Sequence, residues 1–223
     1  MADTGVRLHH DAVVLAGGRS IRMGTDKAAL LLDGRTLLDH TLAAAAGAER
    51  RLIVGPQRRP GWTTVTEPCP GRGPVAALAA GIAALQGNPH PDAPPTTQGP
   101  TSPQWVLLLA CDHPRIAEAV PALLAEVTRA ESTRDTADDA GPAGYLATDD
   151  TGRDQYLLGC HRREALTAAL AALGAPEDAA MGRLFRRLDL RPVPLGALAR
   201  DVDDPTQARR AGIAVGDPHQ TPR

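Results

Sequence analysis

Short runs of consecutive apolar residues alternate along this chain with alanine-rich stretches that favour helix. The runs are residues 11–16 (DAVVLA), 51–55 (RLIVG) and 105–111 (WVLLLAC), and the helical stretches are 36–48, 74–85 and 116–129. A strand buried on both faces of a parallel sheet forms a continuous apolar run. The alternation therefore predicts an α/β fold, with a mostly parallel, twisted, Rossmann-like sheet that carries helices on both faces.

Weaker patterns extend this sheet. Thr36 precedes the first helical stretch and is a candidate N-cap, because its hydroxyl can accept a hydrogen bond from the first turn. Further candidate strands lie at 63–66, 145–147 and 156–160, and the last two are possible antiparallel strands. Two further candidate helices lie at 163–173 and 180–188.

The chain of 223 residues suits one domain, which we place at residues 1–215. Residues 87–103 contain six prolines among polar residues and predict a flexible surface insertion. Residues 131–142 are polar and charged and predict a second mobile loop, and 216–223 predict a disordered tail.

The composition excludes several classes of protein. Lys plus Arg is 24 and Asp plus Glu is 26, the net charge is −2, and the aromatic residues are two Trp, two Tyr and one Phe. A nucleic-acid partner is not expected, because basic surface and stacking side chains are both scarce. No apolar run reaches about 18 residues, so no membrane association is expected. The three cysteines form no CxxC pair, which favours a reducing, cytoplasmic location.

A glycine-rich turn follows the first predicted strand, at residues 15–27 (LAGGRSIRMGTDK). The turn matches neither the Walker phosphate loop nor the dinucleotide fingerprint GxGxxG. Gly17 and Gly18 let the backbone approach a ligand closely, and exposed N–H groups in such a turn bind anions. Arg22 and Lys27 add positive charge where open α/β sheets bind ligands. The turn therefore predicts a phosphate-binding site.

The same thirteen residues resemble the signature of the molybdenum cofactor guanylyltransferases, the MobA-like NTP transferases, which is approximately LAGGxSxRMGxDK. The similarity continues at residues 31–40, 73–78, 112 and 201–205, and so covers about 11–212. It implies a nucleotidyltransferase fold and the transfer of GMP from GTP to the terminal phosphate of molybdopterin, with release of pyrophosphate. It also implies Mg²⁺ as cofactor and a transient contact with molybdoenzymes or their chaperones.

The resemblance assigns roles to individual residues. Asp112 ends an apolar strand, as suits a Mg²⁺ ligand beside phosphates, and Asp203 is favoured over Asp201 as the second ligand. Gln155 is a candidate contact to the pterin. The candidate catalytic residues are Arg22, Lys27 and Asp112, and the candidate nucleotide-binding residues are Leu15, Ala16, Gly17, Gly18, Arg22, Lys27 and Asp112.

Several of these residues have a second interpretation. Asp112 could instead cap the next helix, Gln155 could be a plain edge-strand residue, and the arginines at 183, 186, 187 and 191 could form a solvated helix face. Residues 111–114 (CDHP) are more similar to cytidylyltransferases, so a cytidylyltransferase or another phosphorylated acceptor is an alternative. A non-catalytic nucleotide-binding regulator is a further alternative. His113 is interpreted as a loop residue and Cys111 as core.

Overall fold

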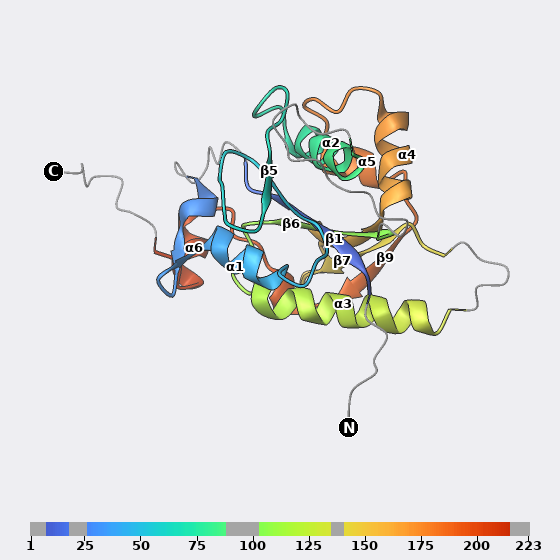
Figure 1. Ribbon diagram of the computed structural model, residues 1–223. Helices are drawn as coiled ribbons and strands as arrows, with labels where there is room; N and C mark the ends of the chain where they lie inside the picture. Colours follow the sequence, from blue (N-terminus) through green and yellow to red (C-terminus); the bar gives the residue numbers. More distant parts are fainter. Residues whose placement is uncertain (1–7, 18–25, 88–102, 135–140, 215–223) are drawn as a thin grey trace.

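The computed structural model describes residues 8–17, 26–87, 103–134 and 141–214, which form an α/β fold around one mixed sheet (Figure 1). The sheet has seven strands in the order β5-β4-β1-β6-β8-β7-β9. All neighbouring pairs are parallel except those that involve β8, so β8 alone runs against the other strands of this sheet. The strands are β1 (His10–Leu15), β4 (Arg51–Val54), β5 (Thr63–Val65), β6 (Trp105–Ala110), β7 (Gly144–Thr148), β8 (Asp154–Arg162) and β9 (Leu190–Pro194).

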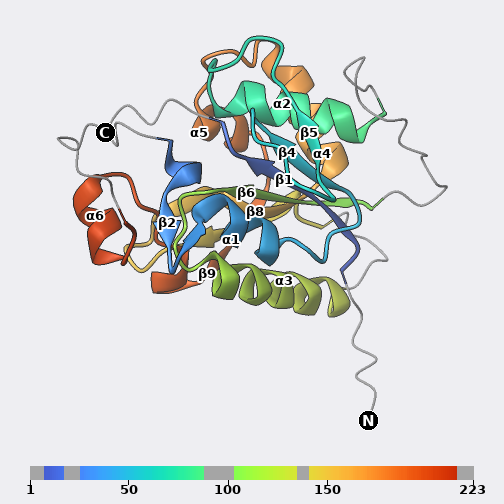
Figure 2. The same cartoon turned by 60° about the vertical axis from the view of Figure 1, so that its left-hand side comes forward.

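Helices cover both faces of the sheet, as predicted (Figures 1 and 2). One face packs against α1 (Leu37–Ala44) and α3 (Ile116–Ser132), and the other against α2 (Pro74–Leu85), α4 (Arg163–Leu173) and α5 (Met181–Phe185). Alternate residues of β6 divide between the two cores: Leu107 and Leu109 face the first and Leu108 the second. The short elements are the 3-10 helices η1 (Lys27–Ala29) and η2 (Gly196–Ala199), the hairpin of β2 (Leu31–Leu32) and β3 (Arg35–Thr36), and α6 (Pro205–Arg210).

The sequence predicted the start of α1 correctly but made two helices too long. The Thr36 Oγ1 atom accepts a hydrogen bond of 3.0 Å from the Asp39 N–H, so Thr36 is the N-cap of α1, as predicted. Helix α1 nevertheless ends at Ala44 and not at residue 48, because the chain enters a turn in which the Ala46 N–H bonds to the Ala43 carbonyl. Helix α5 is likewise shorter than the predicted 180–188.

One strand was missed and one loop was misplaced. Strand β9 was not predicted, because Pro192 and Pro194 lower the strand signal. The strand lies at the edge of the sheet, where proline is tolerated. The predicted loop at 131–142 begins too early, since α3 continues through Glu131. The Glu131 carboxylate accepts hydrogen bonds of 2.8 Å from both Tyr145 and Arg162, which explains its place in an ordered helix.

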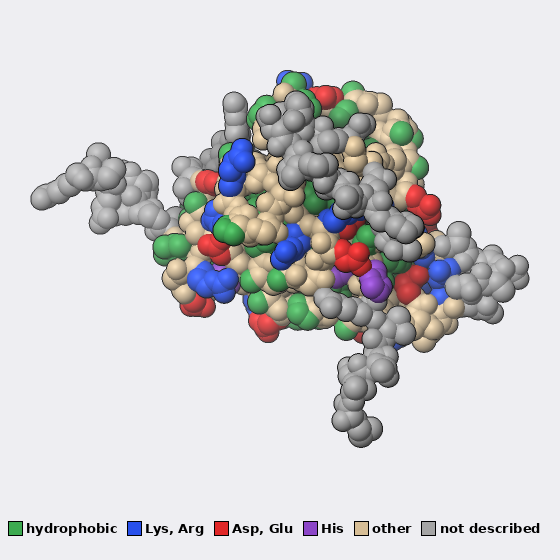
Figure 3. Space-filling model, viewed as in Figure 1, with side chains coloured by type: hydrophobic (Ala, Val, Ile, Leu, Met, Phe, Trp, Pro, Cys, Tyr) green, Lys and Arg blue, Asp and Glu red, His purple; other side chains and the backbone are tan. Residues whose placement is uncertain are grey.

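Acidic and basic side chains are interspersed over the face shown in Figure 3, so the described residues of this face form no continuous basic surface. Among the described helices, none is long and apolar enough to cross a membrane. Most of the proline-rich insertion (residues 88–102), residues 135–140 of the second predicted loop and the predicted tail lie outside the described residues.

A histidine is fully buried within the sheet. The His161 ring stacks on Phe185 with 5.0 Å between the ring centres, and neither ring nitrogen has a hydrogen-bond partner. Gly144 and Gly159 provide the space, because a Cβ atom on either glycine would collide with the imidazole. Burial lowers the pKa of His161 to about 3, so the ring is neutral in the folded protein.

We expect His161 to make the fold sensitive to acid. The pKa is near 6.5 in an unfolded chain and about 3 when folded, so the unfolded state binds the proton and stability falls as the pH drops below 6.5. At pH 5 the expected loss is about 2 kcal/mol relative to pH 7.5. Urea unfolding at the two pH values measures this difference. His161→Leu should remove most of it, whereas His9→Gln, at an exposed histidine, should not. An equal loss in wild type and His161→Leu would show that other groups cause the sensitivity.

Candidate active site

Three predicted site residues meet at the carboxyl ends of β1 and β6. The Lys27 Nζ atom lies 3.0 Å from the Asp203 Oδ1 atom and 3.5 Å from the Asp112 Oδ2 atom. The Val202 N–H donates a hydrogen bond of 2.9 Å to the Asp112 carbonyl, which fixes the late segment against the end of β6. Residues separated by 176 positions in the sequence are thereby joined in one ion-paired cluster.

Local capping holds Lys27 in place. The Asp26 carboxylate caps η1 through a hydrogen bond of 3.0 Å from the Ala28 N–H, and it accepts another of 3.0 Å from the Gln57 amide. Lys27 is the first residue of η1, so the cap fixes its backbone directly after the glycine-rich turn. Gly18 and Arg22, predicted in the same turn, lie outside the described residues.

A third carboxylate joins Asp112 and Asp203. One oxygen each of Asp112, Asp201 and Asp203 lies within 4.8 Å of the others. The pKa of Asp201 is raised by burial and then by the negative charge of Asp203, while Arg153 acts in the opposite direction. Three carboxylates this close together concentrate negative charge, which a hard divalent cation such as Mg²⁺ can neutralise. Sequence reasoning favoured Asp203 over Asp201, and the fold brings both together with Asp112.

Arg153 is a site residue that sequence reasoning missed. Its Nη1 atom lies 3.6 Å from the Asp201 Oδ1 atom and 4.0 Å from the Asp203 Oδ2 atom, and 61% of its side chain is exposed. The residue follows Gly152 in the turn between β7 and β8. A single arginine in a polar turn carries no distinctive sequence signal, so only the topology shows that it faces the acidic cluster.

The backbone that follows the first strand lies near the buried carboxylate of Glu67. The Ala16 N–H bonds to the Val54 carbonyl at 2.9 Å, and a Cβ atom on Gly17 would lie 3.7 Å from the Glu67 Oε1 atom. Leu15 and Ala16 are both buried, so they offer a ligand their backbone and not their side chains.

Glu67 is buried, yet its Oε2 atom has no hydrogen-bond partner. Burial raises the pKa of Glu67, against the opposing effect of the Gly71 N–H. A buried polar atom without a partner is costly, and it points to a ligand that would satisfy it. Sequence reasoning missed Glu67, because a lone glutamate in a proline-rich loop gives no pattern.

Gln155 does not occupy an edge strand, so that interpretation was wrong: β8 lies between β6 and β7. The Gln155 side chain is buried and its amide donates a hydrogen bond of 3.1 Å to Asp149. That carboxylate accepts further hydrogen bonds within its turn, the largest effect coming from Thr151, and they lower the pKa of Asp149 to about 2. The amide nitrogen is therefore already engaged at the turn before β8.

The residues that follow β6 differ in their roles. Asp112 does not cap the next helix, because Arg115 is the N-cap residue of α3. His113 is buried, with its Nε2 atom 3.7 Å from the Asp112 Oδ1 atom. Cys111 is core, as expected, and burial raises the pKa of its thiol to about 12, which excludes a thiolate nucleophile at neutral pH.

The arginine-rich segment near α5 does not form a single helix face. The arginines at 183, 186 and 187 lie in and just after α5, whereas Arg191 lies on β9. Arg183, Arg186 and Arg187 are exposed, as expected, but only Arg183 belongs to a helix face.

Comparison with known proteins identifies the family of this chain. Residues 12–193 match the family model of the MobA-like NTP transferase domain. The "Probable molybdenum cofactor guanylyltransferase" of Deinococcus radiodurans is 40% identical over 113 residues, which are 46% of this chain and 55% of that protein. The "Molybdenum cofactor guanylyltransferase" of Shewanella sp. strain MR-4 is 28% identical over 177 residues, 74% of this chain and 76% of that protein. The chain thus spans about half the length of the first of these relatives.

Solved structures share the fold. Molybdopterin-guanine dinucleotide biosynthesis protein A from Archaeoglobus fulgidus has a TM-score of 0.61 at 16% identity, over 91% of this chain and 96% of that one. The 2-C-methyl-D-erythritol 4-phosphate cytidylyltransferase from Thermus thermophilus has a TM-score of 0.54 at 18% identity, over 90% and 96%. The predicted nucleotidyltransferase fold is thereby confirmed. Since the family model spans most of the sequence, this chain belongs to the MobA-like NTP transferase family.

Proposed function

We propose that this protein transfers GMP from GTP to the terminal phosphate of molybdopterin and releases pyrophosphate. The observation that carries the proposal is the convergence of Lys27, Asp112 and Asp203 beside Gly17, at the carboxyl edge of the sheet. Open α/β sheets bind their ligands at this edge. The names of the relatives, several of them molybdenum cofactor guanylyltransferases, support the choice of nucleotide and acceptor.

The acidic cluster fits the Mg²⁺ that the family resemblance implies. Asp112 and Asp203, with Asp201 beside them, offer the oxygen ligands that Mg²⁺ prefers. When bound there, Mg²⁺ would neutralise negative charge on the nucleotide phosphates.

The reaction places few demands on acid–base groups. The second pKa of a phosphate monoester is about 6, so the acceptor phosphate is mostly dianionic at neutral pH and needs no general base. The remaining work is to position the two substrates and to neutralise their charge. In this proposal, Lys27 and Arg22 stabilise the departing pyrophosphate. The exposed guanidinium of Arg153 orients the acceptor phosphate beside the acidic cluster.

Glu67 and Gly17 suit the recognition of guanine. Guanine presents two adjacent donors, at N1 and N2, and the Glu67 Oε2 atom, which has no hydrogen-bond partner among the described residues, is an acceptor for such a donor. Cytosine presents one donor beside an acceptor, so it would leave a polar atom unpaired. Each unpaired buried group costs about 1–3 kcal/mol. Two mismatches therefore favour GTP over CTP on the order of 10²-fold or more.

We expect kcat/KM for GTP to exceed that for CTP by about 10²-fold in the wild type. Gly17→Ala should erode this preference without unfolding the protein, because the added Cβ atom would lie 3.6 Å or more from its neighbours while it displaces the base. Glu67→Gln should also reduce the preference, since an amide can accept only one of the two donors. Steady-state kinetics with both nucleotides measures these ratios.

A wild-type preference for CTP would contradict the guanylyl proposal and favour the cytidylyltransferase alternative, which residues 111–114 suggest. Pyrophosphate release with GTP, Mg²⁺ and molybdopterin tests the reaction itself. Release with GTP and a different phosphorylated acceptor, but not with molybdopterin, would assign another substrate. Nucleotide binding with no release for any acceptor would favour a regulator.

A further inference from the structure

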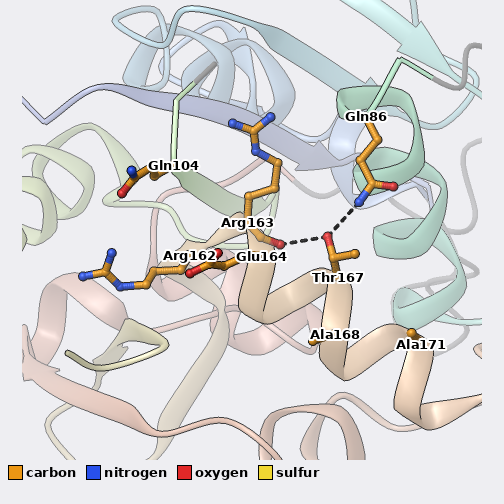
Figure 4. Close-up of a pocket in the computed structure, with 8 residues that line it drawn as sticks. All are labelled: Gln86, Gln104, Arg162, Arg163, Glu164, Thr167, Ala168 and Ala171. Atoms are coloured by element: carbon orange, nitrogen blue, oxygen red, sulfur yellow. Dashed lines mark hydrogen bonds between the residues drawn. The ribbon is translucent and has the colours of Figure 1, made fainter. Parts of the chain in front are cut away.

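A groove opens at the end of the sheet opposite to Lys27 and Asp112. It has a volume of about 510 Å³ and lies between the start of α4, the end of α2 and Gln104, which precedes β6 (Figure 4). Trp105, the first residue of β6, pairs with His10 and with Arg162, which places this groove at the amino ends of β1 and β6. Six strand residues at about 3.3 Å each separate the two ends, so the groove lies roughly 20 Å from the candidate active site.

The groove holds a cation that has no hydrogen-bond or ion-pair partner among the described residues, the Arg163 guanidinium. Burial lowers the pKa of Arg163, the negative charge of Asp11 opposes this effect, and the positive charge of Arg50 lowers the pKa further. Asp11, the nearby carboxylate, already binds Arg50 through two contacts of 3.0 Å and 2.6 Å. The group of two arginines and one aspartate therefore carries a net positive charge beside the groove.

Polar side chains border Arg163 in the groove. In Figure 4 its side chain extends between Gln86 and Gln104, while Glu164, the carboxylate of the lining, points to another side. Helix α4 begins at Arg163 without a side-chain N-cap, and the Arg163 N–H donates a hydrogen bond of 2.7 Å to the Gln104 carbonyl. Arg162 differs from Arg163, because it is committed to Glu131 and to the Pro142 carbonyl.

We propose that this groove binds a phosphate group, with Arg163 as the main contact and with any organic part of the ligand along Ala168 and Ala171. An arginine fork matches phosphate oxygens better than a point charge does. The groove has a size typical of small-molecule sites. This binding site is separate from the proposed catalytic function and does not depend on it.

A two-dimensional ¹H–¹⁵N NMR titration of the full chain tests the proposal, because it locates binding residue by residue. Inorganic phosphate is the first probe and GMP is the second. We expect saturable shifts in the amides of Arg163, Glu164 and Thr167 with at least one of them. Saturation by inorganic phosphate would show that the free ion suffices, and saturation by GMP alone would show that the ligand includes an organic part.

Arg163→Gln should weaken this binding at least tenfold, whereas Arg163→Lys should retain part of it. Arg187→Gln is the matched control, since it removes the same charge from an exposed position outside the groove. A melting curve for each variant confirms that it is folded. Three results would overturn the proposal: no saturable shift around Arg163 with either probe, equal shifts with sodium chloride, or unchanged binding by folded Arg163→Gln. Shifts confined to residues near Gly17 and Lys27 would place the phosphate at the candidate active site and would also overturn it.

Discussion

Asp112→Asn is expected to lower kcat for pyrophosphate release on the order of 10³-fold or more, the largest effect of any single change proposed for this protein. The substitution keeps the shape of the side chain but removes one of three clustered negative charges. The remaining carboxylates would hold Mg²⁺ less tightly, and the charge on the phosphates would be neutralised less well. Steady-state kinetics over a range of Mg²⁺ concentrations measures the loss.

Asp203→Asn should cause a smaller loss, because the Asp203 side chain is more exposed to solvent than that of Asp112 (37% against 22%), so water compensates better for its charge. Asp204→Asn is the matched control: Asp204 caps α6 through the N–H groups of Thr206 and Gln207, and asparagine caps equally well. Its activity should remain near wild type. Our ranking of the ligands would be wrong if Asp203→Asn were more damaging than Asp112→Asn.

Lys27→Ala is expected to reduce kcat by 10²- to 10³-fold, on the order of the effect of removing one preorganised electrostatic group. The stability cost should be about 1 kcal/mol, because the ion pairs with Asp112 and Asp203 are partly exposed to solvent. A melting curve should therefore show a folded protein. Kinetics at saturating GTP and acceptor separate this loss of turnover from weaker substrate binding.

The same variant tests the link between Lys27 and the metal site. Lys27 occupies the acidic cluster as its counter-charge, so its removal leaves three carboxylates to repel one another. Added Mg²⁺ should then raise the Tm of Lys27→Ala more than that of wild type, since ligand binding stabilises the folded state. If Lys27→Ala kept the wild-type kcat, Lys27 would have no role in the mechanism. If Mg²⁺ raised the Tm of both proteins equally, Lys27 would have no role at the metal site.

Much of the fold follows from signals that act over short distances in the sequence. The apolar runs at β1, β4 and β6 can be buried on both faces only within a sheet, and the alanine-rich stretch at α2 forms the helix with the bounds that its pattern predicts. The Thr36 cap depends on a contact three residues away. Such features are encoded locally, so the pattern of residue types is enough to predict them.

The candidate site could be predicted only in part. The glycine-rich turn and Lys27 were found because they form a distinctive string, Asp112 because it follows a strong strand, and Asp203 through the family resemblance at residues 201–205. Glu67 and Arg153 could not be found in this way, since neither belongs to a pattern. Their roles arise because the carboxyl ends of β4 and β5, and the turn before β8, lie beside the same sheet edge.

The sequence by itself determined the α/β class and most of the elements, and it singled out the first turn as a candidate phosphate-binding site. Only the tertiary structure decided that Asp201 joins Asp203 and Asp112, that Glu131 anchors β7 and β8, and that His161 is buried without a partner. The physical reason is distance along the chain. Backbone preferences and apolar periodicity act within one element, whereas charge clusters and buried polar groups depend on which elements pack together, and that depends on the whole fold.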